Sequence, residues 1–236
     1  MRSIILMVWL SLTIGVATAL AQVPDYTESF DKGVKLARAN EFSSAIAEFR
    51  TILGGVGNDE AKLGQIHFNI GACLYRLGSL DEAVSELTQA IMYRPDYERA
   101  FYSLGMAEYG RRRFAAAQEA FVQALHIDRR NAETWYDLGY ALIAQEKFEG
   151  AAAAFERASK YKSIDTAKAH NNVGVILAMS HKFRQAEAEF QKALNVSRGL
   201  LEVAQNNLAI CRRLMVFNDN AMAANLSFGV DRSEGE

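Results

Sequence analysis

The sequence has little proline and little cysteine. Its 236 residues include only two prolines, Pro24 and Pro95, and two cysteines, Cys73 and Cys211. Proline is the residue that most strongly interrupts a helix, so long helices are permitted along almost the whole chain. Half of the residues are hydrophobic, which is ample apolar material for a folded body. Whether the two cysteines can pair depends on where the fold places them.

An excess of basic charge is also lacking. The 26 Lys and Arg residues are balanced by 28 Asp and Glu residues, and the isoelectric point is near 6.1. Such a chain has no field that attracts phosphate backbones independently of sequence, so we do not expect a nucleic-acid partner.

Motifs that carry catalysis are missing from the sequence as well. There is no G-x-S-x-G turn, no C-x-x-C, no dinucleotide-binding glycine pattern and no histidine pair of the H-E-x-x-H kind. The four histidines are scattered, and we interpret His67 and His170 as packing residues of the core rather than metal ligands. We therefore predict no enzyme activity, no metal and no cofactor.

The first 21 residues predict a signal peptide. A basic start, Met1-Arg2-Ser3, is followed by an uncharged apolar run from Ile4 to Leu20 and then by small residues before Gln22. We expect export and cleavage before Gln22, leaving a protein without stable membrane insertion: periplasmic in a Gram-negative cell, otherwise secreted. The alternative is an uncleaved signal that anchors the protein, because the apolar run is near the lower limit for a spanning helix.

Five glycines recur along the chain at nearly constant spacing. Gly71, Gly105 and Gly139 are 34 residues apart, Gly174 follows after 35, and Gly33 precedes by 38. An alanine stands 12 residues after each glycine and a large apolar residue 16 after it: Ala45, Ala83, Ala117, Ala151, Ala186, and Phe49, Leu87, Phe121, Phe155, Phe190. Periodicity of this length is the signature of a repeat array.

Each repeat has the pattern of two packed helices. Trp135, Leu138, Gly139 and Leu142 share one face of a first helix, and a second stripe runs through Phe155. A single pair cannot bury its apolar face, whereas stacked pairs share a continuous core. The sequence thus predicts an all-α solenoid.

The spacing W-x2-L-G followed by A-x3-F-x2-A resembles the tetratricopeptide repeat, most fully in residues 132–165 and next in 64–97. This resemblance implies a right-handed α-solenoid over residues 22–216. Its expected parts are repeats at about 26–59, 64–97, 98–131, 132–165 and 167–200, a capping helix at 201–215 and a disordered tail at 217–236. Departures from the family pattern include His67 and His170 in the Trp column and Glu108 in an apolar column.

The repeat pattern separates the two cysteines. Cys73 and Cys211 stand two residues after the glycine column in distant repeats, where small buried residues are expected. Helices pack ~8–10 Å apart, and a disulfide needs Cα atoms within ~7 Å, so we predict no intramolecular disulfide.

A second row of the first helices is also apolar, at three before, one after and four after each glycine. The resemblance implies that this row lines a concave groove. We predict a binding site there, densest at the aromatic residues in the middle of the chain. The candidate residues are Phe68, Tyr75, Arg99, Tyr102, Met106, Tyr109, Tyr136, Tyr140, Ile143, Lys168 and Asn171. The alternative is that neighbouring helices bury most of these side chains.

Basic residues flank the predicted row, including Arg38, Arg76 and Arg99. They can pair with a carboxylate of a partner, or they can be solvated side chains of a helix surface. The Lys and Asn pair with which chaperone-binding members of the family hold a terminal carboxylate is missing, since the matching positions are Phe68 and Ala72, or Tyr102 and Met106.

The leading interpretation is an exported adaptor that binds a peptide or helical segment of a partner protein in an aromatic groove, without catalysis. A structural scaffold or self-associating assembly factor of an envelope complex is the alternative.

Overall fold

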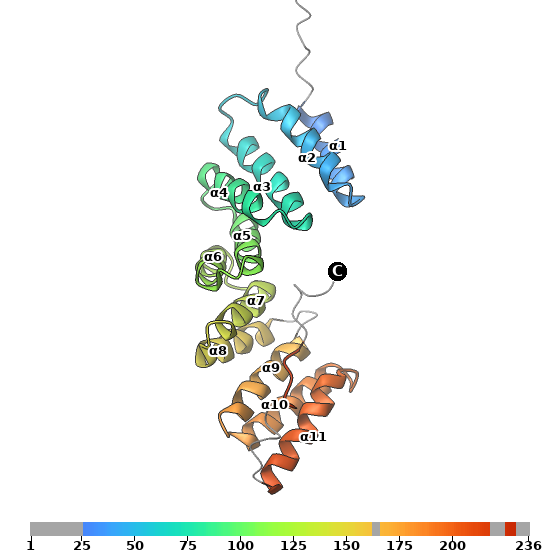
Figure 1. Cartoon of the computed structure of the whole chain (residues 1–236), viewed down its shortest axis with the longest axis vertical. Helices are drawn as coiled ribbons and strands as arrows, with labels where there is room; N and C mark the ends of the chain where they lie inside the picture. The colour runs from blue at the N-terminus through green and yellow to red at the C-terminus, as the bar shows by residue number, and fades with distance from the viewer. Residues whose placement is uncertain (1–25, 162–165, 218–224, 230–236) are drawn as a thin grey trace, which may run out of the picture.

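The computed structural model describes residues 26–161, 166–217 and 225–229, and all regular secondary structure within them is helical (Figure 1). The helices are α1 Tyr26–Arg38, α2 Phe42–Leu53, α3 Glu60–Arg76, α4 Leu80–Tyr93, α5 Glu98–Gly110, α6 Phe114–Ile127, α7 Ala132–Ile143, α8 Phe148–Lys160, α9 Thr166–Met179, α10 Phe183–Val196 and α11 Glu202–Phe217. The predicted all-α repeat architecture is confirmed. The predicted signal peptide lies outside the described residues.

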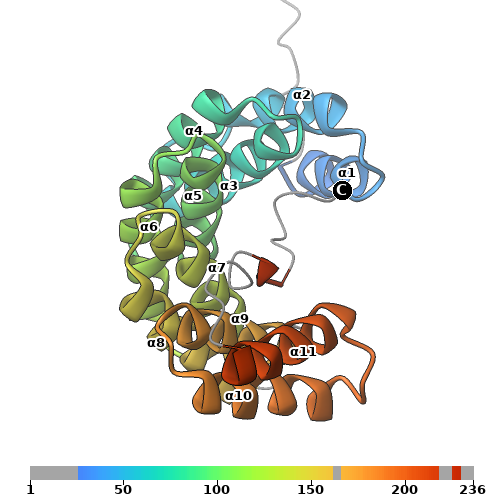
Figure 2. The same cartoon turned by 60° about the horizontal axis from the view of Figure 1, so that its bottom comes forward.

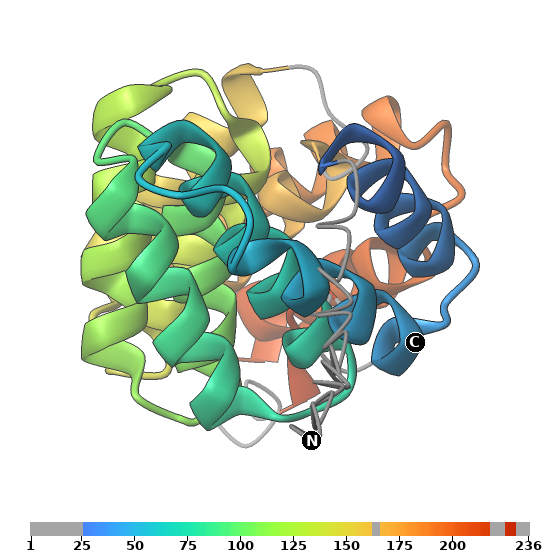
Figure 3. The ribbon, with the colours of Figure 1, turned by 90° about the horizontal axis from the view of Figure 1, so that it is seen from above.

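The helices form five stacked hairpins and a final single helix. Each odd-numbered helix packs on the even-numbered helix that follows it, and each hairpin packs on the next. The stack is curved: the odd-numbered helices lie on the inner, concave side and the even-numbered helices outside them (Figure 2). Seen from above, the N-terminal hairpin and the C-terminal helices come round to the same side of the molecule (Figure 3). The array therefore encloses a concave face made by α1, α3, α5, α7, α9 and α11.

A close contact between glycine and a large apolar residue holds each hairpin together. A Cβ atom added to Gly105 would lie 2.5 Å from the Phe121 ring, and one added to Gly139 would lie 2.6 Å from the Phe155 ring. The same contact recurs at Gly33, Gly71 and Gly174. Because real Cβ atoms are never so close, only glycine lets the two helices approach to this distance.

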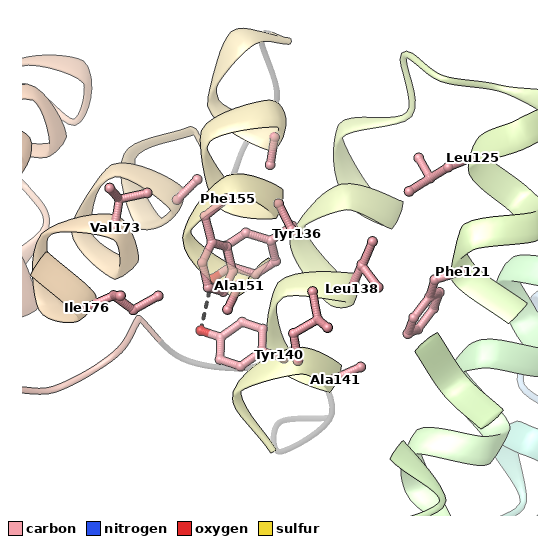
Figure 4. Close-up of a cluster of buried hydrophobic side chains, with 14 of the residues drawn as sticks. Phe121, Leu125, Tyr136, Leu138, Tyr140, Ala141, Ala151, Phe155, Val173 and Ile176 are labelled. Atoms are coloured by element: carbon pink, nitrogen blue, oxygen red, sulfur yellow. Dashed lines mark hydrogen bonds between the residues drawn. The ribbon is translucent and has the colours of Figure 1, made fainter. Parts of the chain in front are cut away.

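The core continues from one hairpin into the next. Phe121 of α6, Phe155 of α8 and Val173 of α9 belong to one buried cluster with residues of α7 (Figure 4). Similar clusters precede and follow it along the array. Burial of this continuous strip stabilises the stack, since no hairpin can cover its own apolar face.

The departures from the family pattern have local partners. Where the family has Trp, His67 contacts Glu86 (Nδ1 to Oε2, 2.7 Å) and His170 contacts Glu189 (2.8 Å), so each histidine joins the two helices of its hairpin. Burial acts to raise the pKa of Glu189, but hydrogen bonds from His170 and Lys192 outweigh it and lower the pKa. Both histidines are half-buried, and each makes a polar contact between helices in place of the apolar packing expected of this column.

The two cysteines are buried and free, Cys73 in α3 and Cys211 in α11. Burial raises the pKa of both thiols, to about 11 for Cys211. Since the thiolate is the reactive species, both behave as apolar core residues. Among the described helices, none combines the length and apolar character needed to span a membrane.

The glycine contact gives a stability prediction. In Gly139→Ala the new methyl group overlaps the Phe155 ring. Overpacking costs about 1–3 kcal/mol and alanine returns up to ~1 kcal/mol of helix propensity, so we expect the free energy of unfolding to fall by about 1–2 kcal/mol.

Gly150→Ala is the matched control, because a Cβ atom there would lie 3.5 Å from Leu142, an ordinary contact. Urea denaturation followed by circular dichroism measures both variants. Equal stabilities would contradict the role given to the glycine column.

Candidate functional site

The concave face has two adjoining hollows at its N-terminal end, which we call together the N-terminal hollow. The first, of about 360 Å³, lies between α1 and α3, and the second, of about 470 Å³, between α3 and α5. Both share Phe68 and Arg99. Their other lining residues include Phe30, Val34, Arg38, Asn69 and Tyr97 in the first and Ala72, Tyr75, Arg76, Tyr102 and Glu133 in the second.

Two of the arginines that line this hollow lie over aromatic rings. The Arg99 guanidinium is 4.9 Å from the centre of the buried Phe68 ring, and that of Arg76 is 5.3 Å from the Phe42 ring. In the described part of the chain, Arg38, Arg76 and Arg99 form no salt bridge. Two carboxylates, Glu98 and Glu133, also line the second hollow, and burial raises the pKa of Glu98. The hollow therefore offers apolar contact together with three cations, Arg38, Arg76 and Arg99, and two carboxylates.

The middle of the concave face is packed rather than open. Met106, Tyr109 and Ile143 lie against the core cluster of α6–α9. Tyr136 is 0% exposed and stacks edge-on against Tyr140 and Phe155 (Figure 4). Its hydroxyl is 3.2 Å from that of Tyr140, and burial strongly raises its pKa. Tyr136 therefore belongs to the packed middle of the concave face, which we call the wall, and its ring is not exposed to a partner.

Tyr102 joins this wall to the N-terminal hollow. Its hydroxyl donates a hydrogen bond to Asp137 Oδ2 at 2.7 Å, a carboxylate that is 3% exposed. The contact links α5 to α7 across the concave face.

The C-terminal end of the concave face holds a segment of the chain itself, residues 225–229. Asn207 Nδ2 donates to the Ser227 carbonyl oxygen at 2.6 Å, and the Ser227 N–H donates to Asn207 Oδ1 at 2.9 Å. The Gly229 N–H donates to Asn172 Oδ1 at 2.6 Å, and the Tyr140 hydroxyl donates to the Gly229 carbonyl oxygen. The groove thus binds this segment through the backbone N–H and carbonyl groups of the segment.

The contacting side chains form one network, which we call the asparagine site: Tyr140 of α7, Asn171 and Asn172 of α9, and Asn207 of α11. Asn207 Nδ2 donates to Asn171 Oδ1 at 2.9 Å, and Asn172 Nδ2 donates to the Tyr140 hydroxyl at 3.0 Å. Asn171 also donates to the Ser227 carbonyl oxygen at 3.2 Å. Because buried amides are costly without partners, this network fixes where a polypeptide backbone can bind.

The sequence predicts a disordered tail from residue 217 onward, and residues 225–229 instead lie in a defined place. Leu226 and Phe228 pack their side chains against the apolar clusters of α9–α11, and Gly229 is buried. Apolar burial and five hydrogen bonds to the backbone of the segment offset the entropy of ordering these five residues.

The predicted site residues fall into separate groups in the structure. Phe68, Tyr75, Arg99 and Tyr102 line the N-terminal hollow. Tyr140 and Asn171 belong to the asparagine site, and Lys168 lies beside it, its Cβ 3.1 Å from a Cβ atom built on Gly229. Met106, Tyr109, Tyr136 and Ile143 are wall or core residues between them.

Sequence reasoning missed Asn172 and Asn207. Both stand two residues before the glycine column, a position that is polar in every repeat: Asp31, Asn69, Ser103, Asp137, Asn172 and Asn207. A polar column inside otherwise apolar helices is the signal that would have found them. The described residues contain no cluster of His, Cys, Asp and Glu fit to hold a metal ion.

The backbone contacts predict slow amide exchange. The Ser227 N–H is donated to Asn207, so Asn207→Ala should speed exchange at Ser227 and Gly229 by about tenfold or more, measured by hydrogen exchange with fragment-level mass spectrometry.

Asn206→Ala is the control, because Asn206 is the exposed neighbour on the same helix. Fast exchange at Ser227 in the unaltered protein would contradict the described contacts.

Parts of this chain are similar in sequence to proteins of known name. A BBSome complex member BBS4 homolog of Drosophila melanogaster is 27% identical over 54% of this chain and 25% of its own length. The type IV pilus assembly protein PilF of Pseudomonas aeruginosa is 26% identical over 63% of this chain and 58% of its own. The chain thus spans less than two thirds of each of these relatives.

Solved structures of MamA share the fold. One superposes with a TM-score of 0.65 at 22% identity and covers 72% of this chain and 90% of that chain. Models of the tetratricopeptide repeat match residues 64–97, 102–163 and 136–199, which together make up more than half of the sequence. The chain belongs to the tetratricopeptide repeat family, whose members are typically non-catalytic scaffolds for protein–protein interaction.

Proposed function

We propose that this protein is an exported adaptor that binds an extended segment of a partner protein along its concave face. The main support for the proposal is the set of hydrogen bonds between the asparagine site and the backbone of residues 225–229. A surface that binds one extended polypeptide through its backbone has the chemistry to bind another.

The N-terminal hollow supports a preference for segments that combine apolar and acidic side chains. Phe68 and Tyr102 supply ring surfaces, and Arg76 and Arg99 supply cations that lack a salt bridge among the described residues. A carboxylate paired with such a guanidinium gains charge-assisted hydrogen bonds, and neighbouring apolar side chains gain burial. Export is supported by the predicted signal peptide.

A photocrosslinking experiment tests this proposal. A benzophenone amino acid at position 75, in the full-length protein, should crosslink to a partner from the native compartment, because Tyr75 lines the hollow. The double substitution Arg76→Glu/Arg99→Glu should reduce that crosslink by about tenfold through charge repulsion.

Arg50→Glu is the control, since Arg50 is an exposed residue of the outer helix α2. A crosslink that survives the double substitution, or is lost equally in the control, would contradict binding in the N-terminal hollow.

Assembly of several copies into an envelope scaffold is a second candidate, favoured by the name of PilF as a pilus assembly protein. Light scattering separates the two: a scaffold should grow in mass between low and high micromolar protein, whereas an adaptor should keep the mass of one chain. Constant mass would exclude self-association as the function.

A further inference from the structure

Residues 225–229 bind the concave face as a peptide ligand would. The backbone groups of Ser227 and Gly229, two residues apart, form hydrogen bonds with the groove, while Leu226 before them and Phe228 between them pack on the apolar clusters. Alternation with a period of two is that of an extended strand. The asparagine side chains therefore make the hydrogen bonds that a neighbouring strand would make in a sheet.

The fit also defines a sequence pattern. Phe228 packs against both the α6–α9 cluster and the α9–α11 cluster, and Leu226 against the latter. The Ser227 side chain is exposed, so the site does not restrict the residue type at this position. A Cβ atom on Gly229 would lie 3.1 Å from Lys168 Cβ and 3.3 Å from Asn172 Oδ1, so the last position favours glycine. The pattern over positions 226–229 is an apolar residue, any residue, an aromatic residue and glycine.

The asparagine site has polar groups suited to a polypeptide backbone. Asn171, Asn172 and Asn207 are at most 1% exposed, and their side-chain amides gain partners from the backbone of residues 227–229. Without the segment, water can make these hydrogen bonds, and a second polypeptide backbone can replace that water in the same geometry. An apolar small molecule cannot restore them.

The occupant belongs to the same chain, which gives it a concentration advantage. Only seven residues separate Phe217 at the end of α11 from Asn225. A short tether of this kind holds a ligand at an effective concentration on the order of mM. A partner must compete against that local concentration.

We infer that residues 225–229 are an intramolecular pseudo-ligand that closes the asparagine site, and that the site opens to partner segments carrying the same apolar-x-aromatic-glycine pattern. This inference deepens the proposed function and rests on it for the use of the concave face. Binding of a partner is thereby regulated by closure of the site: the apparent affinity equals the intrinsic affinity multiplied by the fraction of open molecules.

The test is a titration of full-length protein into a fluorescent peptide of residues 223–231, followed by anisotropy. The unaltered protein should bind weakly, and Phe228→Ala/Gly229→Val, which releases the segment, should bind at least about tenfold more tightly. Ser227→Pro is a second release variant, because proline has no N–H to donate to Asn207. Adding Asn207→Ala to either release variant should abolish the gain.

Equal affinities of the unaltered and release variants, or no binding by folded release variants, would overturn the inference. A mass that doubles in the unaltered protein and falls to one chain on release would also overturn it, since the segment would then be held by a second copy. This test is independent of the crosslink at position 75. Peptide binding without that crosslink would contradict only the proposed use of the N-terminal hollow. The crosslink without peptide binding would contradict only the role of residues 225–229 as a pseudo-ligand.

Discussion

The contact between a glycine of one helix and a large apolar ring of its hairpin partner is the constraint on which the whole structure depends. Gly139 against Phe155 shows why: the ring occupies the place where any side chain would begin. The alanine column of the second helices, such as Ala151, is fully buried. Repetition of one short distance thus sets the spacing of the two helices in each hairpin, and the hairpins built in this way stack on one another.

Curvature in turn places one face of every odd-numbered helix on the inside. On that face the column two residues before each glycine is polar, and at the C-terminal end it supplies Asn172 and Asn207. The same column supplies Asp137, which accepts a hydrogen bond from Tyr102. Apolar neighbours provide burial and this column provides hydrogen bonds, so the concave face can hold an extended backbone at one end and apolar, acidic side chains at the other.

Sequence periodicity predicted most of the fold because repeats carry the same signal several times. The hairpin boundaries follow directly from the glycine, alanine and phenylalanine columns. The site was less predictable. Periodicity identifies which residues share a helix face, but it does not say which of them a neighbour covers, and Tyr136 is covered by Tyr140 and Phe155 while Tyr102 remains at the edge of a hollow. Nor could it predict residues 225–229, because a five-residue segment has no period of its own and is ordered only by contacts with α7, α9 and α11.

The measurement that tests the central claim most directly is nuclear Overhauser spectroscopy on the full-length protein with labelled methyl groups, at a concentration where it is a single chain. The account predicts cross-peaks from the Phe228 ring to methyl groups of the clusters around α9, within one molecule. Phe228 ring signals at solvent-exposed shifts, with no cross-peak to α9, would contradict a concave face that binds extended polypeptide.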